Sequence, residues 1–276
     1  MDVEQLAVVV EDLFRSGTET DRKEVAAVAE EVVGLLDRGE VRVASKSGDG
    51  WVVHQWVKQG ILLYFRSRWP ETERVGSMEF NDLVPVKTGH AAAGVRVVPP
   101  AVARRGSYLG SHVVLMPGYV NIGAHVGART MIDTWATVGS CAQIGERVHL
   151  SGGVGIGGVL EPVQAGPVII EDDVFVGSRS IVVEGFVVKE KAVLAANVVL
   201  TASTPVIDVT GERPREYRGV VPPGAVVVPG ARRREFPAGE FFLSTPLIVG
   251  WRSDETHAKL APNEILRDFV EDAAPS

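Results

Sequence analysis

Two histidines, His125 and His149, are the side chains whose chemistry is most versatile, since a neutral imidazole can act as a general base or bind a metal ion. They lie 24 residues apart, and Asp133 lies between them. A carboxylate at that position could hold an amine or accept its proton. A metal centre shared between subunits would need three histidines, so these two are too few. Cys141 is the only cysteine, and paired cysteine ligands are therefore excluded.

Glycines and arginines form a second group with chemical potential. Gly152-Gly153 and Gly157-Gly158 would let a ligand approach the backbone closely, although tight turns explain glycine pairs equally well. Arg232-Arg233-Arg234 is a basic cluster that could meet phosphate groups. A solvated run of charge is at least as good an interpretation of it.

The residues between 102 and 206 must position these groups, and their pattern has a six-residue period. Every sixth residue is apolar in a first series, which is then resumed in a second one: Val102, Tyr108, Val114, Val120, Val126, Ile132, Val138, Ile144, Leu150, Ile156; and Ile170, Val176, Val182, Val188, Leu194, Leu200, Val206. Such a period fits neither a helix nor an alternating sheet, and it is typical of a parallel β-helix. The sixth-position residues point inward, and three hexads form one triangular coil. A sandwich of ordinary strands would not hold this phase.

The two series are out of phase by a segment with loop composition, residues 157–167, which we expect to leave the prism as an insertion. The residues 220–229 are expected to form the closing coil. Periodicity does not give the hand of the β-helix.

The flanking regions have a different character. We expect helices over 3–15, 22–36 and 55–65, a hairpin from 41–44 and 51–54, an irregular loop over 66–81, a strand over 241–249 and a last helix from about 261 to 270. The predicted division is a small α+β cap domain (1–90), the β-helix domain (91–230) with the insertion at 157–167, and a C-terminal strand and helix (231–276).

Composition narrows the function classes. The net charge of −7 argues against nucleic-acid binding. No apolar run is long enough to span a membrane, and the start of the sequence lacks a signal-peptide pattern. A single cysteine suits a reducing compartment, so we expect a cytoplasmic protein.

Several stretches closely resemble one family, the bacterial tetrahydrodipicolinate N-succinyltransferases of lysine and diaminopimelate biosynthesis. The resemblance covers nearly the whole chain and is carried by Val53-His54-Gln55-Trp56-Val57-Lys58-Gln59, Arg96-Val97-Val98-Pro99-Pro100, Val114-Leu115-Met116-Pro117, Tyr119-Val120-Asn121-Ile122-Gly123-Ala124, and the runs Asp133 to Gly145 and Val148 to Pro162. It implies a left-handed β-helix and a homotrimer with active sites between subunits. It also implies acyl-CoA as co-substrate, by default succinyl-CoA, and an amino dicarboxylate as acyl acceptor, with no bound cofactor or metal.

The resemblance also assigns roles to individual residues. Asp133 matches the substrate-binding aspartate of the family, and we expect it to orient the amine and to accept its proton. An aspartate that merely completes a turn is the alternative. Arg96 matches the arginine that binds a substrate carboxylate, and Arg179 also matches. Gly152, Gly153 and Gly158 are expected along the path of the acyl-CoA. His125 and His149 are interpreted as structural, although related acetyltransferases use a histidine base.

Departures from the family pattern cluster at the expected site. The family has Ser-Glu-Val-Val-Glu-Gly where this chain has Ser180 to Gly185, so Ile181 replaces a glutamate while Glu184 is retained. A Ser-Met-Gly near the thioester is replaced by Ala195-Ala196-Asn197. An arginine is lost at Pro205, and a lysine-rich stretch is replaced at 249–252. Losing polar groups weakens the case for a succinyl carboxylate, so an acetyl donor, as in the tabtoxin branch, is an alternative.

Three functions are consistent with this pattern in decreasing order. The first is an acyl-CoA-dependent N-acyltransferase, with a succinyl or an acetyl donor. The second is a paralogue that binds CoA or a dicarboxylate without turnover, which the changes at Ile181 and Asn197 would permit. A metal prism of the γ-carbonic-anhydrase type comes last, because it lacks the third histidine.

Overall fold

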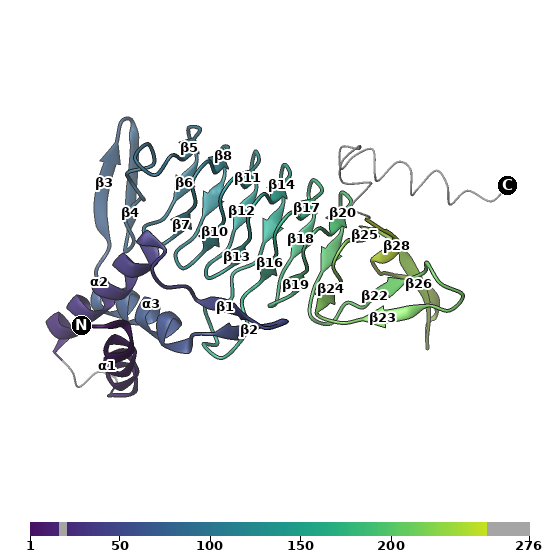
Figure 1. The fold of residues 1–276 in the computed structure, drawn as a ribbon, viewed down its shortest axis with the longest axis horizontal. Helices are drawn as coiled ribbons and strands as arrows, with labels where there is room; N and C mark the ends of the chain where they lie inside the picture. The colour runs from purple at the N-terminus through teal and green to yellow at the C-terminus, as the bar shows by residue number, and fades with distance from the viewer. Residues whose placement is uncertain (17–20, 253–276) are drawn as a thin grey trace.

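The centre of the molecule is a long three-sided prism of stacked short strands (Figure 1). The computed structural model describes residues 1–16 and 21–252. Three helices lie at one end of the prism, and a group of longer strands closes the other end. The fold is a left-handed parallel β-helix with a helical cap, as expected.

Each side of the prism is one parallel sheet, which we call the first, second and third face in chain order. The strands of the three faces are as follows. The first face contains β5 (Arg96–Val97), β8 (Val114–Leu115), β11 (Met131–Ile132), β14 (His149–Leu150), β17 (Phe175–Val176), β20 (Val193–Leu194) and β25 (Ala225–Val228). The second contains β6 (Val102–Ala103), β9 (Tyr119–Val120), β12 (Thr137–Val138), β15 (Gly155–Ile156), β18 (Ile181–Val182) and β21 (Val199–Leu200). The third contains β7 (Tyr108–Leu109), β10 (His125–Val126), β13 (Gln143–Ile144), β16 (Ile169–Ile170), β19 (Val187–Val188) and β24 (Val220–Val221).

The second residue of each two-residue strand points into the prism. Successive side chains of a strand point to opposite sides, so one position enters the core and the other faces outward. Val126 pairs with Ile144 and Ile132 with Leu150, a register of eighteen residues. Each of these four side chains is fully buried in one continuous apolar core. Stacking of like side chains at eighteen-residue intervals therefore confirms the six-residue prediction from Val120 onward.

The predicted phase is wrong in the first coil. Val102, Tyr108 and Val114 are half-buried outward residues, and the inward residues are Ala103, Leu109 and Leu115. The register here is seventeen, because Ala103 pairs with Val120. Only five residues separate Leu115 from Val120, so one residue is missing at this turn. Both members of these strands are apolar, which hid the shift in the sequence.

The predicted insertion is confirmed. Ile144 pairs with Ile170, so the coil that contains residues 157–167 exceeds the usual eighteen residues by eight. The closing coil is also confirmed, since β24 pairs with β19 and β25 with β20 in parallel. Two longer strands then complete this end of the first face: β28 (Leu247–Trp251) pairs antiparallel with β25, and β22 (Val206–Asp208) pairs with β28. A hairpin partner, β23 (Arg215–Tyr217), follows the predicted turn at 210–214.

The coils are stacked so closely at some corners that only glycine fits. A Cβ on Gly139 would lie 2.5 Å from the carbonyl carbon of Gly157 and 2.6 Å from the Cα of Gly158. Real Cβ atoms do not approach other backbones so closely, so this glycine is required by the stacking and not by its own backbone angles.

The cap contains α1 (Val3–Ser16), α2 (Arg22–Arg38) and α3 (Gln55–Ser67). Asp21 caps α2 by accepting the backbone N–H of Lys23, and Gly39 ends it in the left-handed conformation (φ 74°). The three helices share a core with Ile122 and Cys141, which attaches the cap to the prism. The predicted hairpin is displaced in sequence, because β1 (Ala44–Ser47) pairs with β2 (Gly50–Val53).

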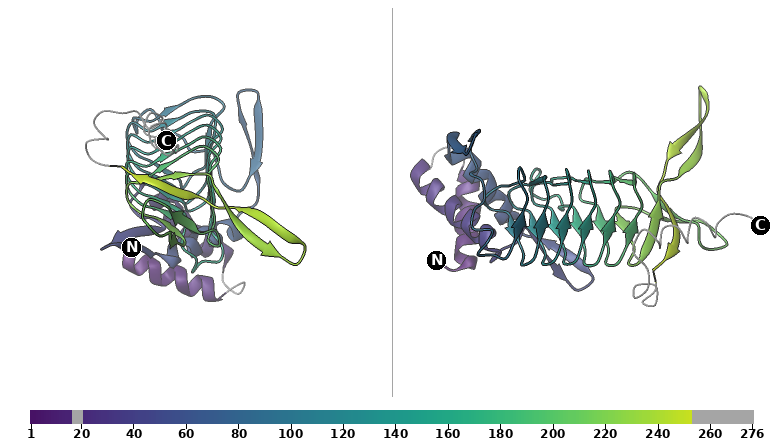
Figure 2. Two further views of the ribbon diagram at one scale, coloured as in Figure 1. Left: turned by 90° about the vertical axis from the view of Figure 1, so that its right-hand side faces the viewer. Right: turned by 90° about the horizontal axis from the view of Figure 1, so that it is seen from above.

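Two further hairpins stand away from the prism (Figure 2). The predicted irregular loop over 66–81 is wrong, because β3 (Glu71–Val75) and β4 (Met78–Asp82) form an antiparallel ribbon. Both of its sides are largely exposed, so it lacks the apolar alternation that identifies a strand. The predicted strand over 241–249 is divided into β27 (Gly239–Ser244) and β28, and β27 pairs with β26 (Ala231–Phe236). The predicted last helix lies outside the described residues.

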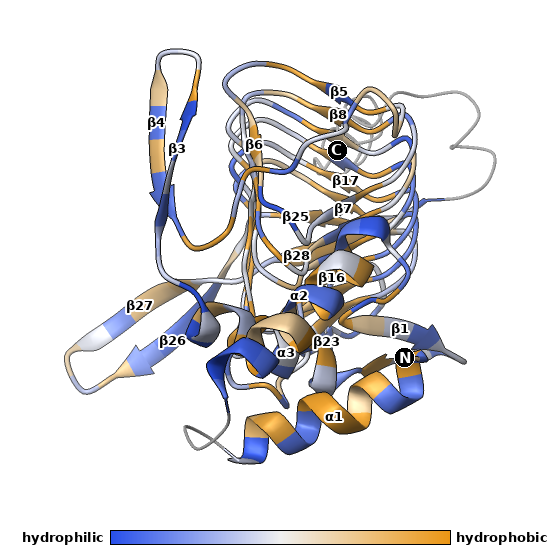
Figure 3. Ribbon diagram, turned by 90° about the vertical axis from the view of Figure 1, so that its left-hand side faces the viewer, coloured by the Kyte–Doolittle hydropathy of each residue, from blue (hydrophilic) through white to orange (hydrophobic). Residues whose placement is uncertain are grey.

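Colouring by hydropathy shows both polar and apolar segments on the helices of the cap (Figure 3). None of the helices in the described part of the chain is long and apolar enough to cross a lipid bilayer.

Candidate functional site

The corner between the first and second faces carries most of the predicted site residues. Its four successive turns are stacked through backbone hydrogen bonds. The N–H of Gly153 donates to Thr134 O (2.9 Å), that of Arg179 to Gly152 O (3.0 Å) and that of Asn197 to Ser178 O (3.1 Å). The structure therefore brings the following predicted residues into one line: Asp133, Gly152, Gly153, Arg179, Ala195, Ala196 and Asn197.

The side chains on this line are displayed outward by an unusual backbone. Trp135, Gly153, Arg179 and Asn197 occupy equivalent positions with φ between 60° and 71°. A non-glycine residue in this region is uncommon, and asparagine tolerates it best. Arg179 and Asn197 are exposed, so the corner offers a guanidinium and a carboxamide to any ligand along it.

Asp133 follows β11 at the start of its turn and is half-buried. Its Oδ1 accepts the backbone N–H of Thr134 (2.6 Å) and the Thr134 hydroxyl (3.2 Å). The turn-forming role considered above is thus present. The same oxygen accepts both bonds, and no hydrogen bond to Oδ2 is found within the described residues, so one carboxylate oxygen remains for a substrate amine.

His149 lies on the outward side of the first face near this carboxylate. It stacks against Phe175 on the next strand, with ring centroids 5.3 Å apart. Burial lowers the pKa of His149, although the charge of Asp133 opposes this shift. The imidazole is therefore neutral at neutral pH and could accept a hydrogen bond, in keeping with its being the histidine more relevant to the site.

Arg96 and Ile181 lie on the faces beside this corner and not on its line. Arg96 is exposed on β5, two strands from Asp133 on the first face. Ile181 is exposed on the second face, where it pairs in register with Gly155 and Val199. The side chains of Ile181 and Val199 are 41% and 39% exposed, which gives this part of the face an apolar surface.

Glu184 and Gly158 lie at a different corner, between the second and third faces. Glu184 accepts the backbone N–H of Ala202 (3.0 Å). Both residues line an open pocket of about 550 Å³ at the base of the insertion. Within one chain, therefore, they are not part of the Asp133 line. The insertion itself is attached to the cap, because the buried Lys58 Nζ donates to Ala165 O (2.6 Å).

His125 belongs to the third face, beneath the cap. It stacks on Tyr108 with ring centroids 4.5 Å apart. Burial, aided by the nearby Arg42 charge, lowers the pKa of His125 to about 3. This histidine is far from the Asp133 line in the fold, as its interpretation as a structural residue requires. No group of three potential metal ligands is found in the described residues.

Comparison with known proteins identifies the family. Residues 5–67 match the model described as tetrahydrodipicolinate N-succinyltransferase N-terminal, and residues 167–202 match the hexapeptide repeat of succinyl-transferase. The 2,3,4,5-tetrahydropyridine-2,6-dicarboxylate N-succinyltransferase of Polynucleobacter asymbioticus is 52% identical over 89% of this chain and 90% of its own. Proteins of the same name are 49% identical in Idiomarina loihiensis (93% of each chain) and 47% identical in Acinetobacter baylyi (95% of this chain and 98% of its own). The chain belongs to the tetrahydrodipicolinate N-succinyltransferase family.

The departures from the family pattern now have positions. Ala195, Ala196 and Asn197 form the last turn of the Asp133 line, and Ile181 lies on the adjoining second face. The basic cluster at 232–234 is on β26 in the projecting hairpin, where Arg233 pairs with Glu235 and Glu240. The structure places it outside the line.

One residue of the line was not singled out by sequence reasoning. Trp135 is 67% exposed and follows Asp133 by two residues. A large exposed aromatic at a corner position where the other coils have glycine, arginine and asparagine is the signal that could have identified it. Its ring is available to cover a ligand bound at Asp133.

Proposed function

We propose that this protein transfers the acyl group of an acyl-CoA, by preference succinyl-CoA, to the nitrogen of tetrahydrodipicolinate or a closely similar amino dicarboxylate. This is the acylation step of diaminopimelate and lysine synthesis. The observation that carries the proposal is the family membership over about nine-tenths of the chain. The line of polar groups beside Asp133 supports it.

The reaction forms a bond between the amine nitrogen and the acyl carbonyl carbon, and the carbon–sulfur bond breaks to release CoA. The nitrogen must also lose a proton. In the proposed mechanism the free oxygen of Asp133 holds the amine and accepts that proton. Arg179, two turns further along the corner, binds a carboxylate of the acceptor or donor as a planar fork.

The proposed assembly is a homotrimer in which the first–second corner of one chain faces a neighbouring prism. Such packing would bring Arg96, Ile181, Glu184 and Gly158 toward a cleft that includes the Asp133 line. It would also give the apolar surface of Ile181 and Val199 a partner, since both side chains are exposed in the single chain.

The donor decides between two forms of this proposal. Acetyl-CoA is favoured by one observation: Ile181 and Val199 present an apolar surface where the family has a carboxylate. A succinyl carboxylate needs cationic partners, and an acetyl methyl group needs none.

A donor competition tests the proposal. The purified protein is incubated with tetrahydrodipicolinate, or with L-2-aminopimelate in its place, and with either succinyl-CoA or acetyl-CoA, and release of free thiol is followed. We expect faster release with succinyl-CoA. A preference for acetyl-CoA would favour the specialised branch of the family, and no release with either donor would favour a silent binding paralogue.

A further inference from the structure

A second pocket lies on the third face, away from the Asp133 line. It has a volume of about 410 Å³ and is bounded by the third face and by the segment that leads into the β1–β2 hairpin. The stacked rings of Tyr108 and His125 line one side of it, and Trp51 of β2 lines another. Two contacts fix the hairpin in place: Arg42 Nε donates to Gln143 Oε1 (3.0 Å), and Trp51 Nε1 donates to Glu171 Oε1 (2.9 Å).

Arg42 is the notable group in this pocket, because its charge is not neutralised. Its guanidinium is held by the amide of Gln143, which is fully buried, and lies 5.7 Å from the centre of the Trp51 ring. Within residues 21–252 it forms no ion pair. Burial lowers the pKa of Arg42, which shows that the charge is poorly compensated. A half-buried guanidinium of this kind is costly unless an anion joins it.

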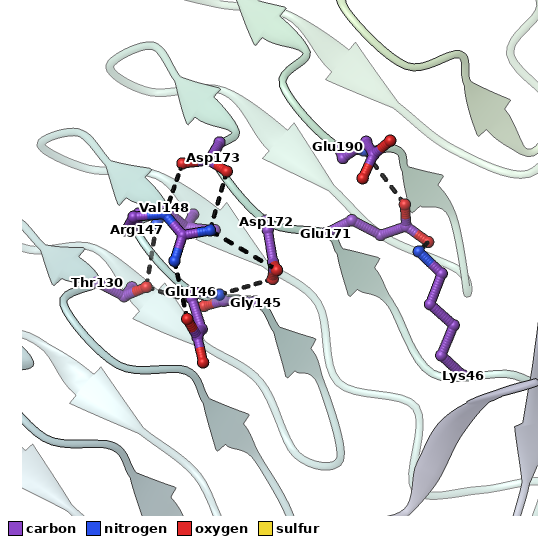
Figure 4. Close-up of polar contacts among 10 residues, drawn as sticks. All are labelled: Lys46, Thr130, Gly145, Glu146, Arg147, Val148, Glu171, Asp172, Asp173 and Glu190. Atoms are coloured by element: carbon purple, nitrogen blue, oxygen red, sulfur yellow. Dashed lines mark hydrogen bonds and ion pairs between the residues drawn. The ribbon is translucent and has the colours of Figure 1, made fainter.

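Carboxylates line the opposite side of the same pocket (Figure 4). Asp172 accepts the backbone N–H of Glu146 through Oδ1 (2.9 Å), and its Oδ2 is 3.9 Å from Arg147. Glu190 is exposed at the rim. Glu171 is already neutralised, since Lys46 and Lys189 lie 3.5 Å and 3.4 Å from its Oε1. The pocket therefore has an anion-seeking end at Arg42 and a cation-seeking end at Asp172 and Glu190.

This distribution of charge selects among ligand classes. A nucleotide or a free phosphate would suit Arg42 and the aromatic rings, but the carboxylates would repel it. A simple amine would leave Arg42 without a partner. We propose that the pocket binds a free α-amino acid, with its carboxylate on Arg42, its ammonium group toward Asp172, and its side chain against the Tyr108, His125 and Trp51 rings.

Three ligands of matched chain length test this proposal by isothermal titration calorimetry with the full-length protein. L-norleucine carries both charges, hexanoate lacks the ammonium group and pentylamine lacks the carboxylate. We expect saturable binding of norleucine, with hexanoate and pentylamine each weaker by about tenfold or more. Equal binding of either single-charge compound, or no binding of norleucine, would overturn the proposal.

Two substitutions locate the site. Asp172→Asn keeps an oxygen for the Glu146 N–H, and it should weaken norleucine by about tenfold while leaving hexanoate unchanged. Arg42→Met should abolish binding of both norleucine and hexanoate. Arg213→Met, at an exposed turn, is the control for loss of a positive charge and should bind norleucine normally. If Arg42→Met does not fold, the Asp172→Asn pair of titrations still decides, and unchanged norleucine binding there would contradict the assignment.

Discussion

At the scale of single residues, the structure gives Asp133 two functions that can be separated. One oxygen completes the turn with Thr134, and the other is free for a substrate. An asparagine would keep the amide oxygen for the turn but could not accept a proton. The turn and the proposed chemistry therefore respond differently to the same substitution.

We predict that Asp133→Asn lowers the rate of acyl transfer by roughly 10²- to 10⁴-fold without loss of structure, the usual contribution of a general base. Thiol release measures the rate, and circular dichroism measures the fold. Asp208→Asn is the matched control, because Asp208 Oδ1 accepts the N–H (2.9 Å) and hydroxyl (2.7 Å) of Thr210 in a similar turn. Full activity of Asp133→Asn would refute the catalytic role.

His125 leads to a prediction about acid stability. Its pKa is about 3 in the folded protein and about 6.5 in an unfolded chain. Between these two pH values the unfolded chain binds a proton that the folded protein does not, so the free energy of unfolding decreases as the pH falls through this window. His125→Phe keeps the ring stack on Tyr108 but removes the titration. Urea unfolding at pH 7, 5 and 4 should show a shallower decline for the variant, and parallel declines would contradict the assignment.

At the scale of elements, the stacked corners set strict limits on side-chain size. Gly139 has no room for a Cβ, because the next coil lies directly against it. Gly166, in the insertion, has no atom within 4 Å of the position a Cβ would take. These two glycines differ in packing and neither has a positive φ.

We therefore predict that Gly139→Ala decreases the free energy of unfolding by about 1–3 kcal/mol, the usual cost of overpacking. Gly166→Ala should leave it nearly unchanged. Urea denaturation of both variants provides the comparison, and equal stabilities would show that the coils can separate to admit a methyl group.

The insertion is a second element whose position depends on one contact. Lys58 is fully buried in α3 and donates to Ala165 O (2.6 Å). We predict that Lys58→Met increases hydrogen exchange of the backbone amides at 157–167, because the loop loses its attachment to the cap. Lys23→Met, an exposed change in α2, should not affect it. Unaltered exchange in Lys58→Met would mean that other contacts hold the loop.

The sequence predicted the elements that repeat and failed for those that do not. The eighteen-residue stacking from Val120 onward could be predicted because one inward aliphatic residue marks each strand. The first coil could not, since Tyr108 and Leu109 are both apolar and only the pairing with β10 shows which one enters the core. The Asp133 line followed from the period once three hexads formed a coil. Arg42 could not be identified, because its significance depends on Gln143, about a hundred residues away.

At the scale of the whole molecule, the exposed surfaces call for partners. The apolar part of the second face lies beside the Asp133 line. We predict a native mass about three times the chain mass of 29.5 kDa. Light scattering after size-exclusion chromatography measures it, and Asp133→Asn should give the same value. A monomer with full activity would contradict a site formed between subunits.

The regular stacking of the first–second corner has a further consequence for its length. Neighbouring coils are separated by about 4.8 Å, so the positions of Trp135, Gly153, Arg179 and Asn197 are spaced in whole multiples of that step. Distances along the corner cannot be adjusted gradually, because a partial step would break the hydrogen bonds of every strand in the coil. The protein could change the reach of this corner only by gaining or losing an entire eighteen-residue turn. An extended co-substrate lying along it would then have to differ in length by a matching amount.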